Sequence, residues 1–350
     1  MPLYATETGQ AVSTHSMLKT FRRCPKQAQY KYVERLKPRV IGTPLKRGSW
    51  LHLLLEEKLN GGDWLALHRK LTLQFAELLD EEKDYYGDLP GDCLRLMRSY
   101  EWHYQYDPWK ILETEYTLET EFPDGTLYRG KIDALIENQF GLWIVDHKSH
   151  KKLPDTTFRL LDGQSALYLW AALRMKIPVQ GFIWNYIRTS PPSIPQMTLQ
   201  HRLSRRRIDT DYPTYVGELQ RLKKAGELKI TSEHIAKANY LKTHQYRPGQ
   251  PQLSTFFRRD ILEKKPAMLR RVALENLHTS KRMHAYDYTN IDAVERVVDR
   301  SCTFSCSYVD PCTVELMGGD SRYLRKQNYT VGDPLDYYED RAGDYEKRDN

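Results

Sequence analysis

The sequence has no long apolar run, and it has few cysteines for its length. No stretch of its 350 residues approaches the length of a membrane span, and the opening MPLYATETGQ lacks the charged and then apolar pattern of a secretory signal. We therefore expect a cytoplasmic protein, in a bacterial or a virus-infected cell, that does not bind membranes. Because cytosolic thiols stay reduced, the five cysteines are expected to be metal ligands or core residues rather than disulfides.

The composition is that of a globular chain with a modest positive charge. Hydrophobic residues make up 40% of the sequence and aromatic residues 11%, which argues against disorder and allows one elaborated domain or two. The 53 Lys and Arg exceed the 46 Asp and Glu, a surplus that suits a polyanionic partner. Internal repeats and long low-complexity segments are absent from the sequence.

The positive charge is concentrated in one region. Residues 201–282 hold 19 Lys and Arg against 8 Asp and Glu, so the rest of the chain is net acidic. Basic clusters such as Arg205–Arg207 and Arg258–Arg259 lie among apolar residues at helical spacing. We expect amphipathic helices whose basic faces follow nucleic-acid phosphates, with ordinary solvated helix surface as the alternative.

The order of expected elements is that of a mixed α/β domain. Apolar periodicity predicts helices over 16–31, 49–59 and 88–106, followed by strands over 111–122, 126–137 and 142–150, a helix over 162–176 and a strand over 180–189. Turn signals separate the first three strands, which predicts an antiparallel meander. From about residue 332 the chain becomes acidic and tyrosine-rich, which predicts a loose tail.

The stretch GLWIVDHKSH, residues 141–150, ends a buried strand with two charges. Side chains alternate across a strand, so Asp146 and Lys148 share one face while His147 points to the other. Asp133 lies in the preceding strand, and a short turn can bring it beside Asp146 on the same face. Two carboxylates suit a hard divalent cation such as Mg²⁺, which would activate a phosphodiester while Lys148 offsets developing charge.

An Asp-x-Lys alone has little weight, because about one is expected by chance in a chain of this size. Two further pairs accompany it at helical spacing. His52 lies four residues before Glu56, and Gln164 lies four residues before Tyr168. Taken alone, His52 is more simply a core histidine and the second pair more simply helix surface.

The order of these residues resembles the RecB-like branch of the PD-(D/E)xK nuclease superfamily. That branch has, in order, a helix with G-x-x-x-H-x-x-L-E, a strand with G-x-x-D, a strand with D-x-K and a helix with Q-x-x-x-Y. The matching residues here are Gly48, His52, Glu56, Gly130, Asp133, Asp146, Lys148, Gln164 and Tyr168.

The resemblance implies a role for each site residue. His52, Asp133, Asp146 and the backbone carbonyl of His147 would bind Mg²⁺ or Mn²⁺, with Asp133, Asp146 and Lys148 catalytic. Gln164 and Tyr168 would act beside them by contacting the DNA strand near the scissile phosphate. The implied fold is a mixed central sheet flanked by helices, with a helical insertion and a C-terminal cysteine segment.

Four cysteines extend the resemblance. Cys302, Cys306 and Cys312 are clustered and Cys24 is remote, a layout similar to the iron-sulfur subgroup of AddB-like and CRISPR-associated members. There a 4Fe-4S cluster fastens the C-terminal segment to the N-terminal helix. The first two clustered cysteines are separated by three residues here, where the family usually has two. A four-cysteine zinc site and unrelated buried thiols are the alternatives, and Cys93 is expected in the core.

The predicted domain organisation follows from these motifs. We expect a nuclease core over 1–200, a basic helical region of the same domain over 201–285, a cysteine segment over 286–315 and a partly loose tail over 316–350. The predicted activity is metal-dependent exonucleolytic cleavage of single-stranded DNA or duplex ends in recombination or repair, with a helicase or recombinase as a possible partner. A catalytically idle DNA-binding or scaffold subunit and a zinc-stabilised nucleic-acid-binding protein are the alternatives.

Overall fold

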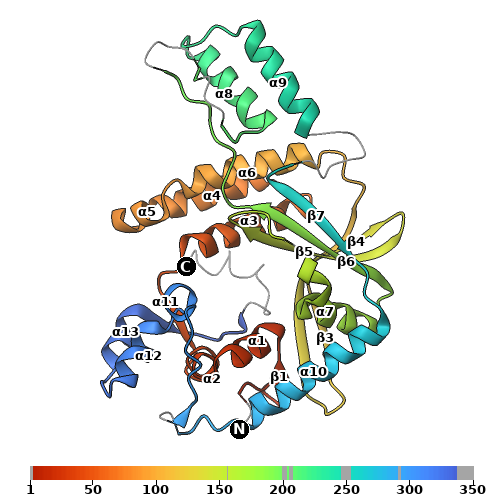
Figure 1. Cartoon of the computed structure of the whole chain (residues 1–350), viewed down its shortest axis with the longest axis vertical. Coiled ribbons are helices and arrows are strands. Elements are labelled where there is room, and N and C mark those ends of the chain that lie inside the picture. Colours follow the sequence, from red (N-terminus) through yellow and green to blue (C-terminus); the bar gives the residue numbers. More distant parts are fainter. Residues whose placement is uncertain are drawn as a thin grey trace.

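A mixed β-sheet with helices on both faces forms the centre of the molecule in this computed structural model (Figure 1). The structure describes residues 3–155, 157–198, 203–204, 208–245, 254–290 and 293–336. The predicted phosphate contacts of Arg205–Arg207 and the end of the predicted tail, residues 337–350, lie outside these ranges.

The sheet contains the meander that the sequence predicts, extended by a parallel strand. Its members are β1 (Val12–Ser13), β3 (Lys110–Glu121), β4 (Leu127–Asn138), β5 (Gly141–His150), β6 (Val179–Arg188) and β7 (Phe257–Leu262). The described strands are ordered β1-β4-β5-β6-β7, with β3 along the other edge of β4. Strands β5 and β6 are parallel, so helix α7 (Gly163–Arg174) supplies the crossover that a parallel pair requires.

Helices cover both faces of the sheet. On one face, α7 packs with α1 (His15–Arg23) and α10 (Pro266–Ala285), over a core that includes Phe182 and Trp184. The other face is covered by α3 (Thr43–Leu59), α4 (Trp64–Ala76) and α6 (Leu89–His103), with α5 (Asp80–Tyr86) beside them. Its core includes Leu54, Met97 and Phe257. Both faces therefore carry helices, as is usual for a sheet that contains a parallel pair.

The N-terminal helix is interrupted, where the sequence predicts one helix over 16–31. Helix α1 ends at Cys24, whose backbone is extended, and is followed by α2 (Pro25–Ala28) and the π-helical turn η1 (Gln29–Val33). Pro25 causes the break, because proline lacks an N–H and disfavours helical backbone in the residue before it. Cys24 therefore lies at a corner of the chain rather than within a helix.

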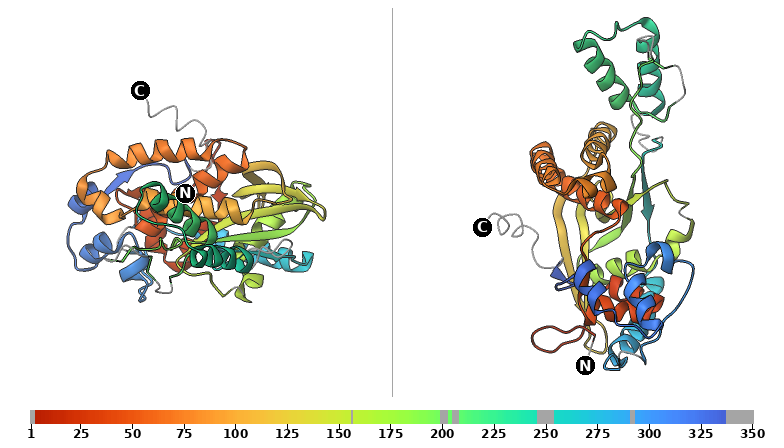
Figure 2. Two further views of the ribbon diagram at one scale, coloured as in Figure 1. Left: turned by 90° about the horizontal axis from the view of Figure 1, so that it is seen from above. Right: turned by 90° about the vertical axis from the view of Figure 1, so that its left-hand side faces the viewer.

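Only part of the expected basic helical region projects from the body. Helices α8 (Tyr212–Lys224) and α9 (Ser232–Gln245) form a hairpin that stands away from the sheet (Figures 1 and 2). The later part of that region is not an insertion, because β7 completes the sheet and α10 packs on α7. A short 3-10 helix, η2 (Thr157–Leu161), leads into α7.

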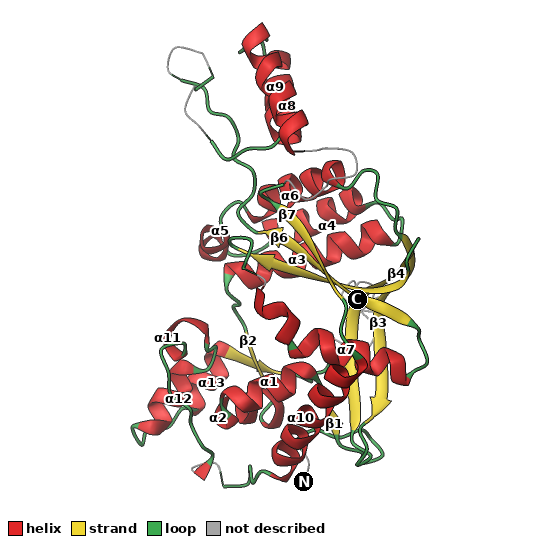
Figure 3. Ribbon diagram, turned by 45° about the vertical axis from the view of Figure 1, so that its right-hand side comes forward, coloured by secondary structure: helices red, strands yellow, loops and turns green. Residues whose placement is uncertain are grey.

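The C-terminal segment, residues 293–336, folds back beside α1 and α2 (Figure 3). It contains α11 (Cys302–Ser305), α12 (Val309–Leu316), α13 (Arg322–Asn328) and β8 (Tyr329–Val331), and β8 pairs antiparallel with β2 (Leu36–Pro38). The described part of the predicted loose tail is thus structured, and Leu335 packs into the core with 4% of its surface exposed. Among the described residues, no helix is both long and apolar enough to cross a membrane.

Candidate active site

The candidate site lies where the regular pairing between β4 and β5 ends. Ala134 pairs with Val145, and the same register places Asp133 opposite Asp146. The hairpin therefore brings the two carboxylates together, as the sequence predicts. A carboxylate oxygen of Asp133 accepts a hydrogen bond from the His147 N–H at 2.5 Å. This side-chain contact satisfies a backbone donor at the point where the regular pairing ends.

Asp146 and Lys148 lie on the face covered by α7. Lys148 Nζ is 2.6 Å from Asp146 Oδ2 and 5.2 Å from the ring centre of Trp184. The side-chain amide of Gln164 donates to Asp146 Oδ1 at 3.1 Å and to the Tyr168 hydroxyl at 3.2 Å. The four-residue spacing on α7 thus places the Tyr168 hydroxyl beside the amide that contacts Asp146.

Glycines allow the two helices of the site to approach the sheet. A Cβ atom at Gly48 would lie 2.9 Å from Ser149 Oγ, so glycine lets α3 lie close to β5. A Cβ atom at Gly130 would lie 2.7 Å from the Tyr168 ring, so glycine lets α7 lie close to β4. Tyr168 is consequently buried, with 6% of its surface exposed. Both motif glycines have a packing reason at these positions.

His52 reaches Asp133 from α3. Its Nδ1 is 3.3 Å from Asp133 Oδ1, and its ring lies edge-on to the His147 ring with the centres 5.9 Å apart. Burial alone would lower the pKa of His52, but the Asp133 carboxylate raises it overall. Burial would raise the pKa of Asp133, and His52 outweighs that effect and lowers it. Each side chain therefore favours the charged form of the other.

The pKa of Asp146 moves in the opposite direction. Burial raises it to about 6, against the attraction of Lys148 and with added repulsion from Asp133. Burial would lower the pKa of Lys148, but Asp146 and Asp133 raise it, so Lys148 keeps its proton. Such divergent shifts in one small region are typical of a chemical site.

His147 lies on the opposite face of β5 from Asp146 and Lys148, as strand alternation predicts. Asn185 lies 2.7 Å from His147 Nδ1 and donates to the Tyr100 hydroxyl at 2.9 Å. Arg259 also contacts that hydroxyl, at 3.2 Å. Burial lowers the pKa of His147 to about 3, so its imidazole is neutral. A buried polar network therefore supports the strand that carries Asp146 and Lys148.

Glu115 belongs to the site, although the sequence pattern does not reveal it. Ligand atoms of His52, Glu115 and Asp133 lie within 4.8 Å of one another, and within the described ranges this is the one group of three or more His, Cys, Asp or Glu that is so close. Asp146 is not part of that group. The residues that the resemblance assigns to metal binding therefore form two groups. One group is His52 with Asp133, joined by Glu115, and the other is Asp146, which lies opposite Asp133 on the next strand.

A comparison with known families decides the identity of the fold. A model of the PD-(D/E)XK nuclease superfamily matches residues 13–313, which is most of the chain. The chain belongs to the PD-(D/E)XK nuclease superfamily. The predicted α/β fold class is therefore confirmed, and the protein is a nuclease by family.

Solved structures similar to this nuclease are distant in sequence. The crystal structure of SSO0001 has 12% identity and a TM-score of 0.31, with 87% of this chain and 86% of that chain covered. A candidate exonuclease from Eubacterium rectale has 13% identity and a TM-score of 0.41, with 87% of this chain and 96% of that chain covered. No curated protein sequence matches the chain. The family assignment therefore rests on the superfamily model.

The four cysteines singled out in the sequence meet away from the nuclease site. Cys24, Cys302, Cys306 and Cys312 line one cavity of about 120 Å³ between the N-terminal helices and the C-terminal segment. Arg23, Lys26 and Arg296 line the same cavity. Cys93 is fully buried in the core beneath α3, α4 and α6, as expected.

Arg259 is not available for the phosphate contact that the sequence predicts. Its guanidinium lies between the rings of Tyr104 and Trp109, with its centre 3.6 and 3.4 Å from theirs, and binds Asp107 at 2.6 Å. The neighbouring Arg258 contacts Asp260 at 3.0 Å and donates to the Pro154 carbonyl at 2.6 Å. Alternation along β7 thus directs Arg259 into the nuclease interior, which a helical interpretation of this segment could not anticipate.

Proposed function

We propose that this nuclease hydrolyses phosphodiester bonds in DNA with Mg²⁺ or Mn²⁺. The observation that carries the proposal is the convergence of Asp133, Asp146 and Lys148 at the open end of one hairpin. The donor set suits such an ion, because carboxylate oxygens are the ligands that Mg²⁺ and Mn²⁺ prefer. When bound, the ion would supply Lewis acidity that polarises a phosphodiester.

His52 and Asp133 would hold the ion together with Asp146 and the backbone carbonyl of His147. Lys148 keeps its proton at Nζ and would donate a hydrogen bond to a phosphate oxygen, which offsets charge that develops during cleavage. Gln164 fixes one oxygen of Asp146, and Tyr168 accepts the second hydrogen bond of that amide. Gln164 and Tyr168 would also position the DNA strand beside the reacting phosphate.

We further propose an exonuclease of the RecB-like branch, acting in the cytoplasm on single strands or duplex ends during recombination or repair. The four ordered motifs support this assignment, because each lies on the helix or strand that the branch requires. A helicase or recombinase that exposes single strands would be a suitable partner. The surplus of basic residues in 201–282 supports a polyanionic substrate.

We propose that Cys24, Cys302, Cys306 and Cys312 hold a 4Fe-4S cluster at the cavity that they line. A tetrahedral zinc site, with bonds of about 2.3 Å, would place its sulfur atoms roughly 3.8 Å apart. Within the described residues, no three of these sulfur atoms lie within 4.8 Å of one another. The wider arrangement around a cavity of about 120 Å³ favours a cluster over a single zinc ion, which remains the alternative.

The test is digestion of end-labelled single- and double-stranded DNA by the full chain. We expect mononucleotides or short fragments from labelled ends with Mg²⁺ or Mn²⁺, and none with EDTA or with Lys148→Ala. Cleavage that persists equally in EDTA would overturn the proposal. DNA binding without any cleavage would identify an idle scaffold subunit instead.

A further inference from the structure

Glu115 occupies an unusual position in strand β3. The register pairs Thr114 with Ala134 and Tyr116 with Ile132, which places Glu115 directly opposite Asp133. Its backbone is left-handed, with φ of +50°, a conformation that non-glycine residues rarely adopt within a strand. Strained backbone of this kind persists only where the surrounding structure enforces it, and it gathers at functional sites.

The side chain of Glu115 turns inward as a result. It is 9% exposed, whereas Glu113, two residues earlier on the same strand, is exposed to solvent. Two buried carboxylates directly opposite each other repel, so Glu115 and Asp133 require positive charge between them or beside them. Lys131 supplies part of it, with its Nζ 3.3 Å from Glu115.

A second observation concerns His147, which lies beside His52. The His147 imidazole is 98% buried against the His52 ring, and its Nε2 has no hydrogen-bond partner in the part of the chain that is described. Buried polar atoms are rarely left without a partner unless a ligand or water completes them. Ligand atoms of His52, Glu115 and Asp133 therefore surround one small volume, and the buried His147 ring lies against its His52 side.

We propose that Glu115 is a ligand of the metal ion, in a position formed by His52 from α3, Glu115 from β3 and Asp133 from β4. This inference rests on the proposed metal-dependent function and adds a third acidic residue to it. An imidazole donor raises affinity for Mn²⁺ relative to Mg²⁺, because nitrogen ligands suit transition metals and Mg²⁺ prefers oxygen. The site should therefore favour Mn²⁺ over Mg²⁺.

The test is Mn²⁺ binding to the full chain, measured by titration calorimetry and by the electron paramagnetic resonance signal of free Mn²⁺. Glu115→Gln is expected to weaken Mn²⁺ binding by tenfold or more. The matched control Glu113→Gln changes the same side chain on the same strand and should leave the affinity within twofold. Wild-type protein should bind Mn²⁺ at least tenfold more tightly than Mg²⁺, and equal affinities would overturn the selectivity.

Glu115→Gln leaves Lys131 buried without its carboxylate, so the variant could fail to fold. The double variant Glu115→Gln/Lys131→Met removes both charges together and keeps the test available. If the folded single or double variant binds Mn²⁺ with wild-type affinity while His52→Ala loses Mn²⁺ binding, the metal site stands but Glu115 is not one of its ligands. Wild-type protein that binds no Mn²⁺ would instead contradict the proposed metal-dependent function.

Discussion

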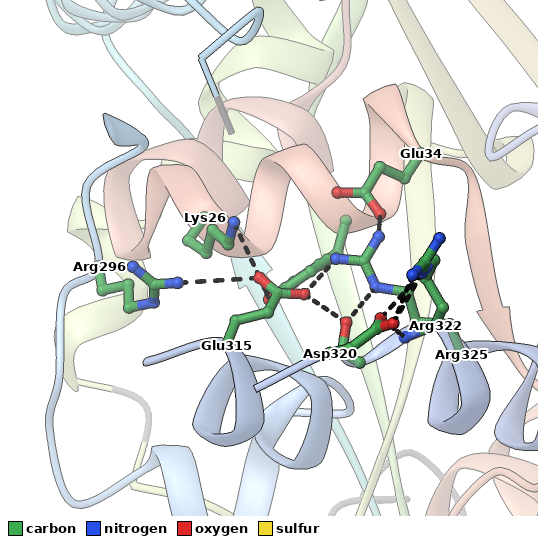
Figure 4. Close-up of polar contacts among 9 residues, drawn as sticks. Lys26, Glu34, Arg296, Glu315, Asp320, Arg322 and Arg325 are labelled. Carbon is green, nitrogen blue, oxygen red and sulfur yellow. Dashed lines mark hydrogen bonds and ion pairs between the residues drawn. The ribbon is translucent and has the colours of Figure 1, made fainter. Parts of the chain in front are cut away.

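Glu315 on α12 and Asp146 on β5 are both poorly exposed carboxylates, but their surroundings differ. Glu315 accepts hydrogen bonds from the Tyr30 hydroxyl at 2.7 Å and the Ser321 hydroxyl at 2.6 Å. It also lies 3.1 Å from Lys26 Nζ and pairs with Arg325 (Figure 4). Within the described residues, the side chain of Asp146 contacts two partners, Lys148 and Gln164.

Their pKa values move in opposite directions. Burial alone would raise the pKa of Glu315, but hydrogen bonds from Ser321, Tyr30, Arg325 and Lys26 lower it to about 2. Burial raises the pKa of Asp146 to about 6, and its few partners do not reverse the shift. A carboxylate surrounded by donors stabilises the fold, whereas one with few donors retains the capacity to bind a substrate or an ion.

The largest expected effect lies on the Asp146 side of this comparison. Asp146→Ala or Lys148→Ala should lower the cleavage rate by about 10³-fold or more, because each removes a group to which we assign a role in the transition state. The melting temperature should change little, since Asp146 has few partners to lose and burial already opposes its charged form. End-labelled DNA digestion and thermal denaturation measure the two effects.

Glu315→Gln is the matched control for activity. It removes a poorly exposed charge from the C-terminal segment, away from Asp146 and Lys148, so its cleavage rate at a temperature where it is folded should equal that of the wild type. Undiminished cleavage by Asp146→Ala, in protein free of host nucleases, would remove Asp146 from the site.

Much of the geometry of the candidate site could be predicted from sequence, because its residues lie on regular elements. Alternation along β5 placed Asp146 and Lys148 on one face, and helical spacing placed Gln164 beside Tyr168. The grouping of the cysteines could also be predicted from sequence, since three of them lie close together in the chain. These features depend on local periodicity, which the sequence carries directly.

Glu115 and Arg259 show where such prediction ends. The stretch ILETEYTLETEF has regular alternation, which places Glu115 among the exposed glutamates of one face. A left-handed residue and a bulge between Ile111 and Glu113 break that alternation, and neither has a sequence signal. Arg259 lies in a basic cluster that suggests a helix, but pairing with β6 makes it a strand and buries the arginine. Tertiary pairing decided both cases.

The second prediction concerns the cysteine-lined cavity between the N-terminal helices and the C-terminal segment. Cys24→Ala and Cys312→Ala should each lower the free energy of unfolding by about 4 kcal/mol, because the proposed cluster would form only in the folded chain and would stabilise it. Anaerobically purified wild type should be brown with absorbance near roughly 400 nm, and both variants colourless. Cys93→Ala should keep the colour. Colourless wild type with stoichiometric zinc would support the zinc alternative.

The third prediction compares neighbouring arginines. Arg259→Met should lower the free energy of unfolding by about 3 kcal/mol, because it leaves Asp107 without its cation. Arg258→Met should cost about 1 kcal/mol, because its contact with Asp260 is partly solvated. Urea denaturation measures both. Two outcomes would contradict the buried role of Arg259. One is an equal loss of unfolding free energy in the two variants, and the other is a reduced salt dependence of DNA binding in Arg259→Met with unchanged stability.

The smallest expected effect lies on the Glu315 side of the opening comparison. Glu315→Gln should lower the free energy of unfolding at pH 7 by about 2 kcal/mol, the scale of hydrogen bonds to a charged group. The pKa of Glu315 falls from its ordinary value of 4.5 to about 2 in the folded protein. A carboxylate with a lowered folded pKa contributes its full stability above the unfolded pKa and loses it as protons bind.

The difference between wild type and Glu315→Gln should therefore be constant from pH 7 to about 5 and shrink as the pH falls from about 4.5 toward 2. Urea denaturation across this range measures it. Asp310→Asn, an exposed acid on the same helix, is the control and should change stability by less than about 0.5 kcal/mol at any of these pH values. A Glu315→Gln deficit that stays constant down to pH 2 would mean that the lost stability comes from packing or geometry rather than from the charge of Glu315.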